Sequence, residues 1–211
     1  MTVARPLSGI VLAGGASRRL GVDKAGLTFG GRPLLEIIVD RLSAVCSEVI
    51  VACGSQTVRE RPALPVRFVK DPIAGQGPLA GVQAGLAAAE SDFCLVVACD
   101  MPFLNPALLA YMAGRPRRYQ ALVPRFAGLW HPLHAAYARS CLPTVESLLA
   151  QGGNSMEELL FHLDVRALSE EELRRHDPQG LSLFNLNDAQ DLTRARALWR
   201  QTAAISQARP A

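Results

Sequence analysis

The sequence from Gly9 to Lys24 reads GIVLAGGASRRLGVDK. Its first five residues, 9–13, form a short apolar run, and a loop with two adjacent glycines and the cations Arg18, Arg19 and Lys24 follows at once. Such a run is too short for an independent helix and predicts a buried strand. A loop directly after a strand is the place where open α/β sheets hold their ligands, beyond the carboxyl ends of the strands.

Further strand-like runs and helix-like segments alternate along the chain. Apolar runs recur at residues 48–52, 66–69 and 93–98. Helical spacing is found at residues 33–45, 81–89, 140–150, 156–163 and 188–205. Two more stretches, 119–124 and 133–137, are expected to complete the sheet. Strands that alternate with helices predict an α/β protein, here a three-layer sandwich with a mostly parallel, Rossmann-like sheet.

The composition favours one domain over residues 1–211, with a frayed tail from about residue 203. Hydrophobic residues make up 49% of the 211 residues and charged residues 19%, and the formal net charge is +3. This charge is too small to indicate a nucleic-acid binder. The longest apolar stretches, such as residues 93–99, fall short of the ~20 residues that a bilayer span needs, and no signal segment opens the chain. We therefore expect a cytoplasmic protein without membrane contact.

The loop after the first apolar run suits a polyphosphate. Glycines let the backbone curl so that several N–H groups converge on an anion, and Arg18, Arg19 and Lys24 add mobile positive charge. The loop contains neither G-x-x-x-x-G-K-[ST] nor G-x-G-x-x-G, so it is neither a P-loop nor a dinucleotide fingerprint. The residues predict a triphosphate site of another kind, and a solvated surface turn is the alternative.

Five short motifs follow one another along the chain: LAGG-x-S-x-R-x-G-x-D-K at 12–24, DP at 71–72, GPLAG at 77–81, CDMP at 99–102 and NLND at 185–188. In this order they resemble the motifs of the molybdenum cofactor guanylyltransferases, a family with the nucleotidyltransferase fold. The opening loop alone is common to many nucleotidyltransferases, whereas the ordered set is specific to the family and spans most of the chain.

The resemblance implies a reaction and a site. The reaction is transfer of GMP from GTP to the terminal phosphate of Mo-molybdopterin, with release of pyrophosphate and with Mg²⁺ as cofactor. The implied nucleotide-binding residues are Leu12, Ala13, Gly14, Gly15, Lys24, Asp71 and Asp100. The implied catalytic residues are Arg19, Lys24 and Asp100, and the implied acceptor-binding residues are Asn185 and Asn187. Further implied partners are proteins that deliver the cofactor and molybdoenzymes that receive it.

The residues themselves support part of this assignment. Asp100 directly follows an apolar run and so emerges at the carboxyl end of a predicted strand, where a carboxylate can hold Mg²⁺ against triphosphate oxygens. A turn residue before Pro102 is the alternative. Asn185 and Asn187 flank Leu186, and alternation in an extended segment puts both amides on one side. Asp188 is expected to cap the last helix.

The sequence is compatible with several alternative functions. Gly14 favours guanylyl over cytidylyl transfer, because cytidylyltransferases of the same fold tend to carry alanine at this position. Ala52 stands where close relatives often carry a nucleotide-contacting asparagine. A sugar-phosphate transferase or a cofactor carrier without catalysis is also compatible with the motifs. A nucleic-acid surface would depend on the cluster Arg115, Arg117, Arg118 and Tyr119, which is more often a solvated loop.

Other side chains are assigned no catalytic role from the sequence. The five cysteines contain no C-x-x-C pair, and they are expected to be small buried side chains with reduced thiols rather than zinc ligands: Cys46, Cys53, Cys94, Cys99 and Cys141. His131 and His134 are expected to be structural. Trp130 is a candidate for stacking on a planar ring.

Overall fold

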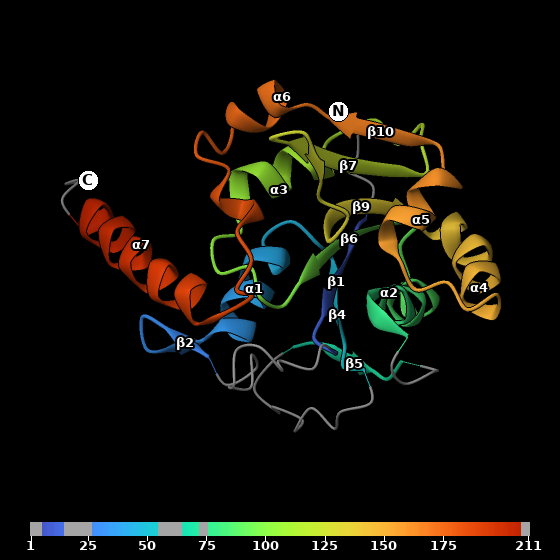
Figure 1. The fold of residues 1–211 in the computed structure, drawn as a ribbon, viewed down its shortest axis with the longest axis horizontal. Coiled ribbons are helices and arrows are strands. Elements are labelled where there is room, and N and C mark those ends of the chain that lie inside the picture. The colour runs from blue at the N-terminus through green and yellow to red at the C-terminus, as the bar shows by residue number, and fades with distance from the viewer. Residues whose placement is uncertain (1–5, 15–26, 55–64, 72–75, 208–211) are drawn as a thin grey trace.

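A computed structural model of the chain describes residues 6–14, 27–54, 65–71 and 76–207, with side chains as far as residue 201. Within these residues one eight-stranded sheet has the order β10-β7-β9-β6-β1-β4-β5, with β8 paired to β7, and a separate pair is formed by β2 (Thr28–Phe29) and β3 (Arg32–Pro33). The buried hydrophobic residues form one core cluster around the sheet. Figure 1 shows the sheet in the middle of the molecule with helices on both sides.

The amino-terminal half supplies the parallel part of the sheet. Its strands are β1 (Ser8–Leu12), β4 (Glu48–Ala52), β5 (Arg67–Val69) and β6 (Phe93–Ala98). Strand β1 lies between β4 and β6 and is parallel to both, with all five of its residues buried. Strands β1, β4 and β6 are almost entirely buried, and strands buried on both faces are continuous apolar runs, so the sequence predicts these three well.

The second half adds strands of mixed direction. Strand β9 (His134–Ala138) is inserted antiparallel between β6 and β7 (Ala121–Phe126), and β10 (Val165–Leu168) pairs parallel with β7. Strand β8 (Leu129–Trp130) returns on β7 through a two-residue turn at Ala127 and Gly128, which have φ of 49° and 80°. Because β9 is antiparallel to β6, β9 starts at the edge of the sheet where β6 ends, and the segment before β9 lies at that edge.

The helices form the two outer layers (Figure 1). Helices α1 (Leu34–Ser43) and α3 (Pro106–Ala113) contact each other on one side, and α2 (Gly77–Ala88), α4 (Leu142–Ala150) and α5 (Met156–Phe161) pack in sequence on the other. The remaining helical segments are α6 (Glu170–Arg174), α7 (Ala189–Gln207) and the 3₁₀ turns Arg139–Cys141 and Leu181–Leu183. The predicted three-layer α/β sandwich is confirmed.

Helix α7 packs back on the domain through Trp199. The Trp199 ring lies 5.4 Å from the Phe29 ring and 6.0 Å from the Phe103 ring, measured between centroids, and Arg41 lies over it. The helix continues to Gln207, so its backbone is helical beyond residue 203, where the sequence suggested fraying. Residues 208–211 lie outside the described part of the chain, and the extent of a single domain over 1–211 stays a prediction.

The start of α2 was predicted wrongly. The sequence places it at residue 81, but the helix begins at Gly77, with Pro78 in its first turn, where a missing N–H is tolerated. Residues 77–80, which the sequence places before the helix, therefore form its first turn. Gly85 lies inside both the predicted and the observed helix, and it packs closely on the sheet, because a Cβ at Gly85 would lie 2.5 Å from Cγ2 of Ile10 in β1.

We predict that Gly85→Ala destabilises the protein. Overpacking against Ile10 costs about 1–3 kcal/mol, which exceeds the roughly 1 kcal/mol that alanine gains over glycine in a helix interior. The free energy of unfolding, measured by urea denaturation, should fall by up to about 2 kcal/mol, which is the difference between these two effects. In an Ile10→Ala background the obstructing atoms are gone, and the same change should be neutral or stabilising. An equal loss in both backgrounds would contradict this explanation.

Candidate functional site

Backbone hydrogen bonds join the ends of the four parallel strands. The N–H of Ala13 donates to the carbonyl of Ala52 over 2.7 Å, and the N–H of Cys99 donates to the carbonyl of Leu12 over 3.0 Å. On the outer side Cys53 donates to Val69 over 2.9 Å. The pairing of the strands thus continues one residue beyond β1, β4 and β6. The loops that follow these strands must start side by side at the carboxyl edge of the sheet.

Two glycines from different loops are in direct backbone contact at this edge. A Cβ on Gly14 would lie 2.6 Å from the backbone nitrogen of Gly54, and a Cβ on Gly54 would lie 2.8 Å from Cα of Gly14. Gly54 also has a φ of +64°, in the left-handed region that favours glycine. Packing against Gly54 therefore explains the missing methyl group at position 14. The guanylyl preference inferred from Gly14 stays a prediction beside this structural reason.

Asp71 lies beside this pair of loops. The N–H of Gly54 donates to Oδ1 of Asp71 over 3.3 Å, and the N–H of Asp71 donates to the carbonyl of Gly54 over 3.4 Å. Burial raises the pKa of Asp71, and the hydrogen bond from Gly54 opposes this shift. Asp71 thus helps to hold the turn at Gly54. Its predicted contact with a nucleotide stays a prediction.

Asp100 connects the parallel strands to the carboxyl-terminal motif. It follows β6 after one intervening residue, Cys99, its Oδ1 atom is buried, and its backbone carbonyl accepts a hydrogen bond of 3.0 Å from the N–H of Leu186. Leu186 is fully buried, and this anchors the NLND motif beside Asp100. The structure therefore brings the first, fourth and fifth motifs together, through Leu12, Asp100 and Leu186.

The two asparagines of the NLND motif have different surroundings. Asn185 is half-buried and its amide nitrogen donates to the carbonyl of Leu183 over 3.3 Å, whereas Asn187 is exposed and its backbone N–H donates to Asp191. Asp188 accepts hydrogen bonds of 2.9 Å from the N–H groups of Gln190 and Asp191, which confirms the predicted cap of α7.

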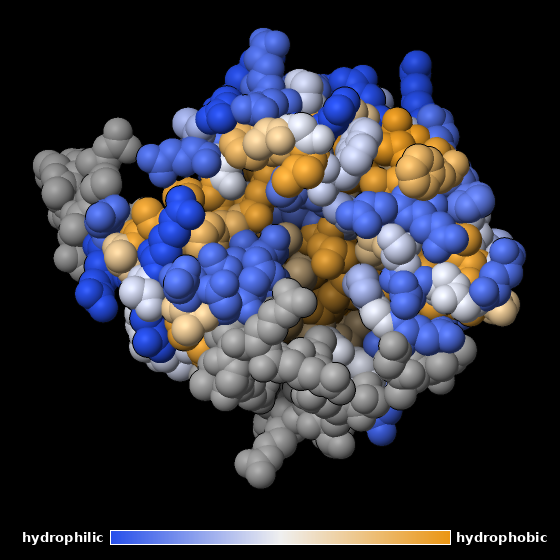
Figure 2. Space-filling view, viewed as in Figure 1, coloured by the Kyte–Doolittle hydropathy of each residue, from blue (hydrophilic) through white to orange (hydrophobic). Residues whose placement is uncertain are grey.

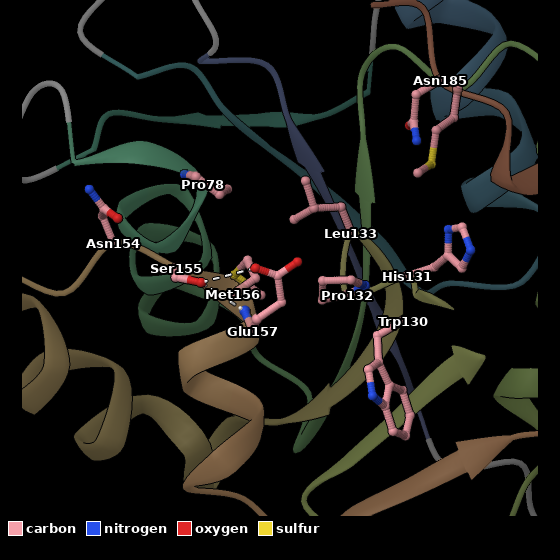
Figure 3. A pocket seen from close by; sticks show the side chains of 11 residues that line it. Pro78, Trp130, His131, Pro132, Leu133, Asn154, Ser155, Met156, Glu157 and Asn185 are labelled. Carbon is pink, nitrogen blue, oxygen red and sulfur yellow. Dashed lines mark hydrogen bonds between the residues drawn. The ribbon is translucent and has the colours of Figure 1, made fainter. Parts of the chain in front are cut away.

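A cavity of about 390 Å³ is lined by Met101, the residue after Asp100, and by Asn185 of the NLND motif, and so lies at the same edge. Figure 2 shows a hollow with a hydrophobic floor on this face of the molecule. One wall comes from the segment before β9 and its surroundings: Met101, Trp130, His131, Pro132, Leu133 and Asn185. The opposite wall, seen in Figure 3, comes from α2 and from the start of α5: Pro78, Asn154, Ser155, Met156 and Glu157. Of the predicted acceptor residues, Asn185 lines this cavity.

Two histidines next to each other in space have no catalytic assignment from the sequence. His131 lines the cavity and its Nε2 atom is buried, while His134 is fully buried at the start of β9. Among the described residues neither ring nitrogen of His134 has a hydrogen-bond partner. Burial lowers the pKa of both side chains, that of His134 to about 4. The expectation of structural histidines holds for His134, whereas His131 also borders the candidate site.

Three of the predicted site residues lie outside the described part of the chain, so their roles stay predictions: Gly15, Arg19 and Lys24. All five cysteines lie in the described part of the chain and none forms a disulfide, and the described residues contain no group of three or more His, Cys, Asp or Glu side chains suited to a metal. No described helix is long and apolar enough to span a bilayer.

The basic cluster after α3 is engaged in contacts within the domain. Arg115 pairs with Glu172 at 3.6 Å, and Arg117 donates to the carbonyl of Pro6 over 3.0 Å and packs on the ring of Phe93. These contacts give two of the three arginines a structural role and weaken the nucleic-acid alternative.

We predict that Gly14→Ala destabilises the protein because the new methyl group meets backbone atoms that cannot rotate away. The free energy of unfolding should fall by about 1–3 kcal/mol. Gly114→Ala is the matched control, because Gly114 has a φ of −79° and the nearest atom to its new Cβ is 3.4 Å away. The control should change stability by less than about 0.5 kcal/mol. Equal values for the two variants would refute the steric argument.

We predict a loss of stability in mild acid that depends on His134. Its folded pKa of about 4 lies below the ordinary 6.5, so the unfolded chain takes up the proton first. The contribution is complete above pH 6.5 and is lost as the pH falls to about 4. At about 1.4 kcal/mol per pH unit it amounts to about 3 kcal/mol. In urea titrations between about pH 7.5 and pH 4, His134→Leu should flatten this dependence, and an unchanged slope would argue against it.

Comparisons with known proteins agree with this geometry. The sequence profile described as "MobA-like NTP transferase domain" matches residues 9–167. A "Probable molybdenum cofactor guanylyltransferase" of Pelotomaculum thermopropionicum is 38% identical over 191 residues, which cover 90% of this chain and 92% of the relative. One from Chloroflexus aggregans is 38% identical over 203 residues, which cover 93% and 97%.

Solved structures agree in the same way. The molybdopterin-guanine dinucleotide biosynthesis protein A from Archaeoglobus fulgidus is 30% identical, with a TM-score of 0.81 over 92% of this chain and 99% of that one. A 2-C-methyl-D-erythritol 4-phosphate cytidylyltransferase from Thermus thermophilus shares the fold, at 21% identity and a TM-score of 0.66 over 90% of this chain and 98% of that one. The matched profile covers most of the chain, including the ends of β1, β4, β5 and β6, and the chain belongs to the MobA-like NTP transferase family.

Proposed function

We propose that this protein transfers GMP from GTP to the terminal phosphate of Mo-molybdopterin and releases pyrophosphate. The observation that carries the proposal is the joining of three distant motifs by two backbone hydrogen bonds, Cys99 to Leu12 and Leu186 to Asp100. These bonds put the predicted nucleotide loop, the predicted metal ligand and the predicted acceptor motif at one edge of the sheet. The names of the relatives support the same reaction.

The chemistry needs positioning and charge compensation more than a protein nucleophile. The attacking phosphate is already anionic near neutral pH, and in-line displacement at the α-phosphorus requires that both substrates be held in register. Leu12, Ala13 and Gly14 offer backbone against the nucleotide, at a point where Gly54 fixes the path of the chain. Arg19 and Lys24 are predicted to offset the negative charge that develops on the phosphates.

The side chains at this edge fit a magnesium ion. Mg²⁺ is commonly held by one or two carboxylates together with substrate phosphates and water, so a single carboxylate is sufficient from the protein. Asp100, with its buried Oδ1 at the end of β6, is the residue that would hold it. When bound, the ion would supply charge compensation to the triphosphate oxygens. A cytoplasmic location and contacts with proteins that deliver or receive the cofactor stay predictions.

The reaction is tested by pyrophosphate release. Purified protein is mixed with Mo-molybdopterin and Mg²⁺, and GTP, CTP, ATP and UTP are compared at equal concentration. Release with GTP alone is expected. Release with CTP instead would keep the fold and the site but reject guanylyl transfer, and ligand binding without any release would indicate a carrier.

We predict that Asp100→Asn lowers the rate of pyrophosphate release by about 10² to 10³, the usual effect of losing one charge-stabilising group. Asp92→Asn is the matched control, since Asp92 is an exposed carboxylate immediately before the amino end of the same strand. The control should retain the full rate. Both variants should keep the circular dichroism spectrum of the parent, and full Mg²⁺-dependent activity of Asp100→Asn would reject its role.

A further inference from the structure

The cavity has a charge pattern that is unusual for a protein acting on phosphates. Among the described residues that line it, Glu157 is the one carboxylate, and there is no lysine or arginine. A carboxylate without a neighbouring cation repels phosphate oxygens. The described lining therefore offers a carboxylate acceptor, which suits a group that donates hydrogen bonds.

The carboxylate of Glu157 is directed into the cavity. Figure 3 shows it reaching from the start of α5 toward Pro132 on the opposite wall. The hydroxyl of Ser155 donates to Oε2 of Glu157 over 3.4 Å and accepts from the N–H groups of Glu157 and Glu158 at 3.2 and 3.3 Å. The first amides of α5 are thus already satisfied by the cap, and the acceptor oxygens of Glu157 face the open space.

The remaining surfaces of the cavity suit a flat ring. Trp130 contributes its indole, which is 38% exposed, and Pro132 and Met156 add apolar surface. The guanidinium of Arg125 packs over the Trp130 ring at 5.7 Å from its centroid and limits the freedom of the indole. A volume of about 390 Å³ lies within the ordinary range for small-molecule sites.

We propose that Glu157 is a specificity-determining residue that recognises the 2-amino-4-oxopyrimidine edge of a ring bound in this cavity. That edge carries a ring N–H and an exocyclic amine side by side, and a carboxylate accepts both in parallel. Pterin and guanine both carry this edge. The proposal rests on the proposed function, in which one substrate contains a pterin and the other contains guanine. Asn185 lines the opposite wall of the same cavity, and this favours the pterin of the acceptor.

The neighbouring residue Glu158 provides a matched control. It lies in the same first turn of α5, is equally exposed, and interacts in the same way with the positive end of the helix. Its carboxylate lies near Gly153, where a Cβ would be 2.9 Å from Oε2, and Glu158 does not line the cavity. If these carboxylates only stabilised the helix, substitution of either glutamate would have a similar effect. If Glu157 recognises the ring, only its substitution should weaken ring binding.

The test is calorimetric titration of the full chain and its variants with three probes. They are 6-hydroxymethylpterin, the analogue with an oxo group in place of the 2-amino group, and GTP. We expect the wild-type protein to bind the amino form about tenfold more tightly than the oxo form. Glu157→Gln should weaken the amino form about tenfold and abolish the preference, whereas Glu158→Gln should leave both affinities within about twofold.

The outcomes separate the two sources and the two proposals. Loss of pterin affinity in Glu157→Gln supports the acceptor ring, and loss of GTP affinity with pterin unchanged supports the same edge in guanine. Equal effects of the two substitutions, no effect of Glu157→Gln on either ring, or no binding of either ring by the wild-type protein would overturn the inference.

Pyrophosphate release is measured separately. A chain with Glu157-dependent binding but no release would reject the proposed function alone, and release with unchanged acceptor KM and GTP KM in Glu157→Gln would reject the inference alone.

Discussion

The place of β1 between two parallel neighbours is the constraint on which the candidate site depends. Leu12 is level with Ala52 in β4 on one side and with Ala98 in β6 on the other. Because β1 is fully buried, its backbone groups require these partners, and the register cannot slip without exposing apolar residues. The loops after the three strands therefore begin at one level. Their proximity is a property of the backbone and does not depend on any one side chain.

The second half of the chain brings its residues to the same edge by a different route. The antiparallel direction of β9 starts that strand where β6 ends, so Trp130 and His131 reach the cavity that Met101 also lines from the opposite direction along the chain. The bond from Leu186 to the Asp100 carbonyl then attaches the segment before α7. Phosphate-directed residues are predicted on the parallel half, while the cavity is walled mostly by the later half. This division suits an enzyme with one nucleotide and one different acceptor.

Much of the fold could be predicted because its strongest signals are local, whereas the site depends more on tertiary packing. The runs 48–52 and 93–98 coincide with β4 and β6, since strands buried on both faces are apolar throughout. The start of α2 at Gly77 was not predicted, because glycine followed by proline is also typical of a turn. Asp100 follows a buried strand and was placed correctly, but Glu157 and His131 carry no motif and reach the site through the packing of α5 and the direction of β9. The alternation argument also failed to distinguish Asn185, which lines the cavity, from the exposed Asn187.

The central position of β1 has a consequence for biosynthesis. Strand β1 precedes both of its neighbours in the chain, and the second of them, β6, is complete only when Ala98 has been made. During that interval an apolar strand keeps an open edge, which is a template for pairing with other chains. Local helices can form early, whereas the sheet must wait for distant segments. The strand that organises the finished protein is thus its main aggregation hazard in the nascent chain, and a chaperone that covers short apolar segments would act there.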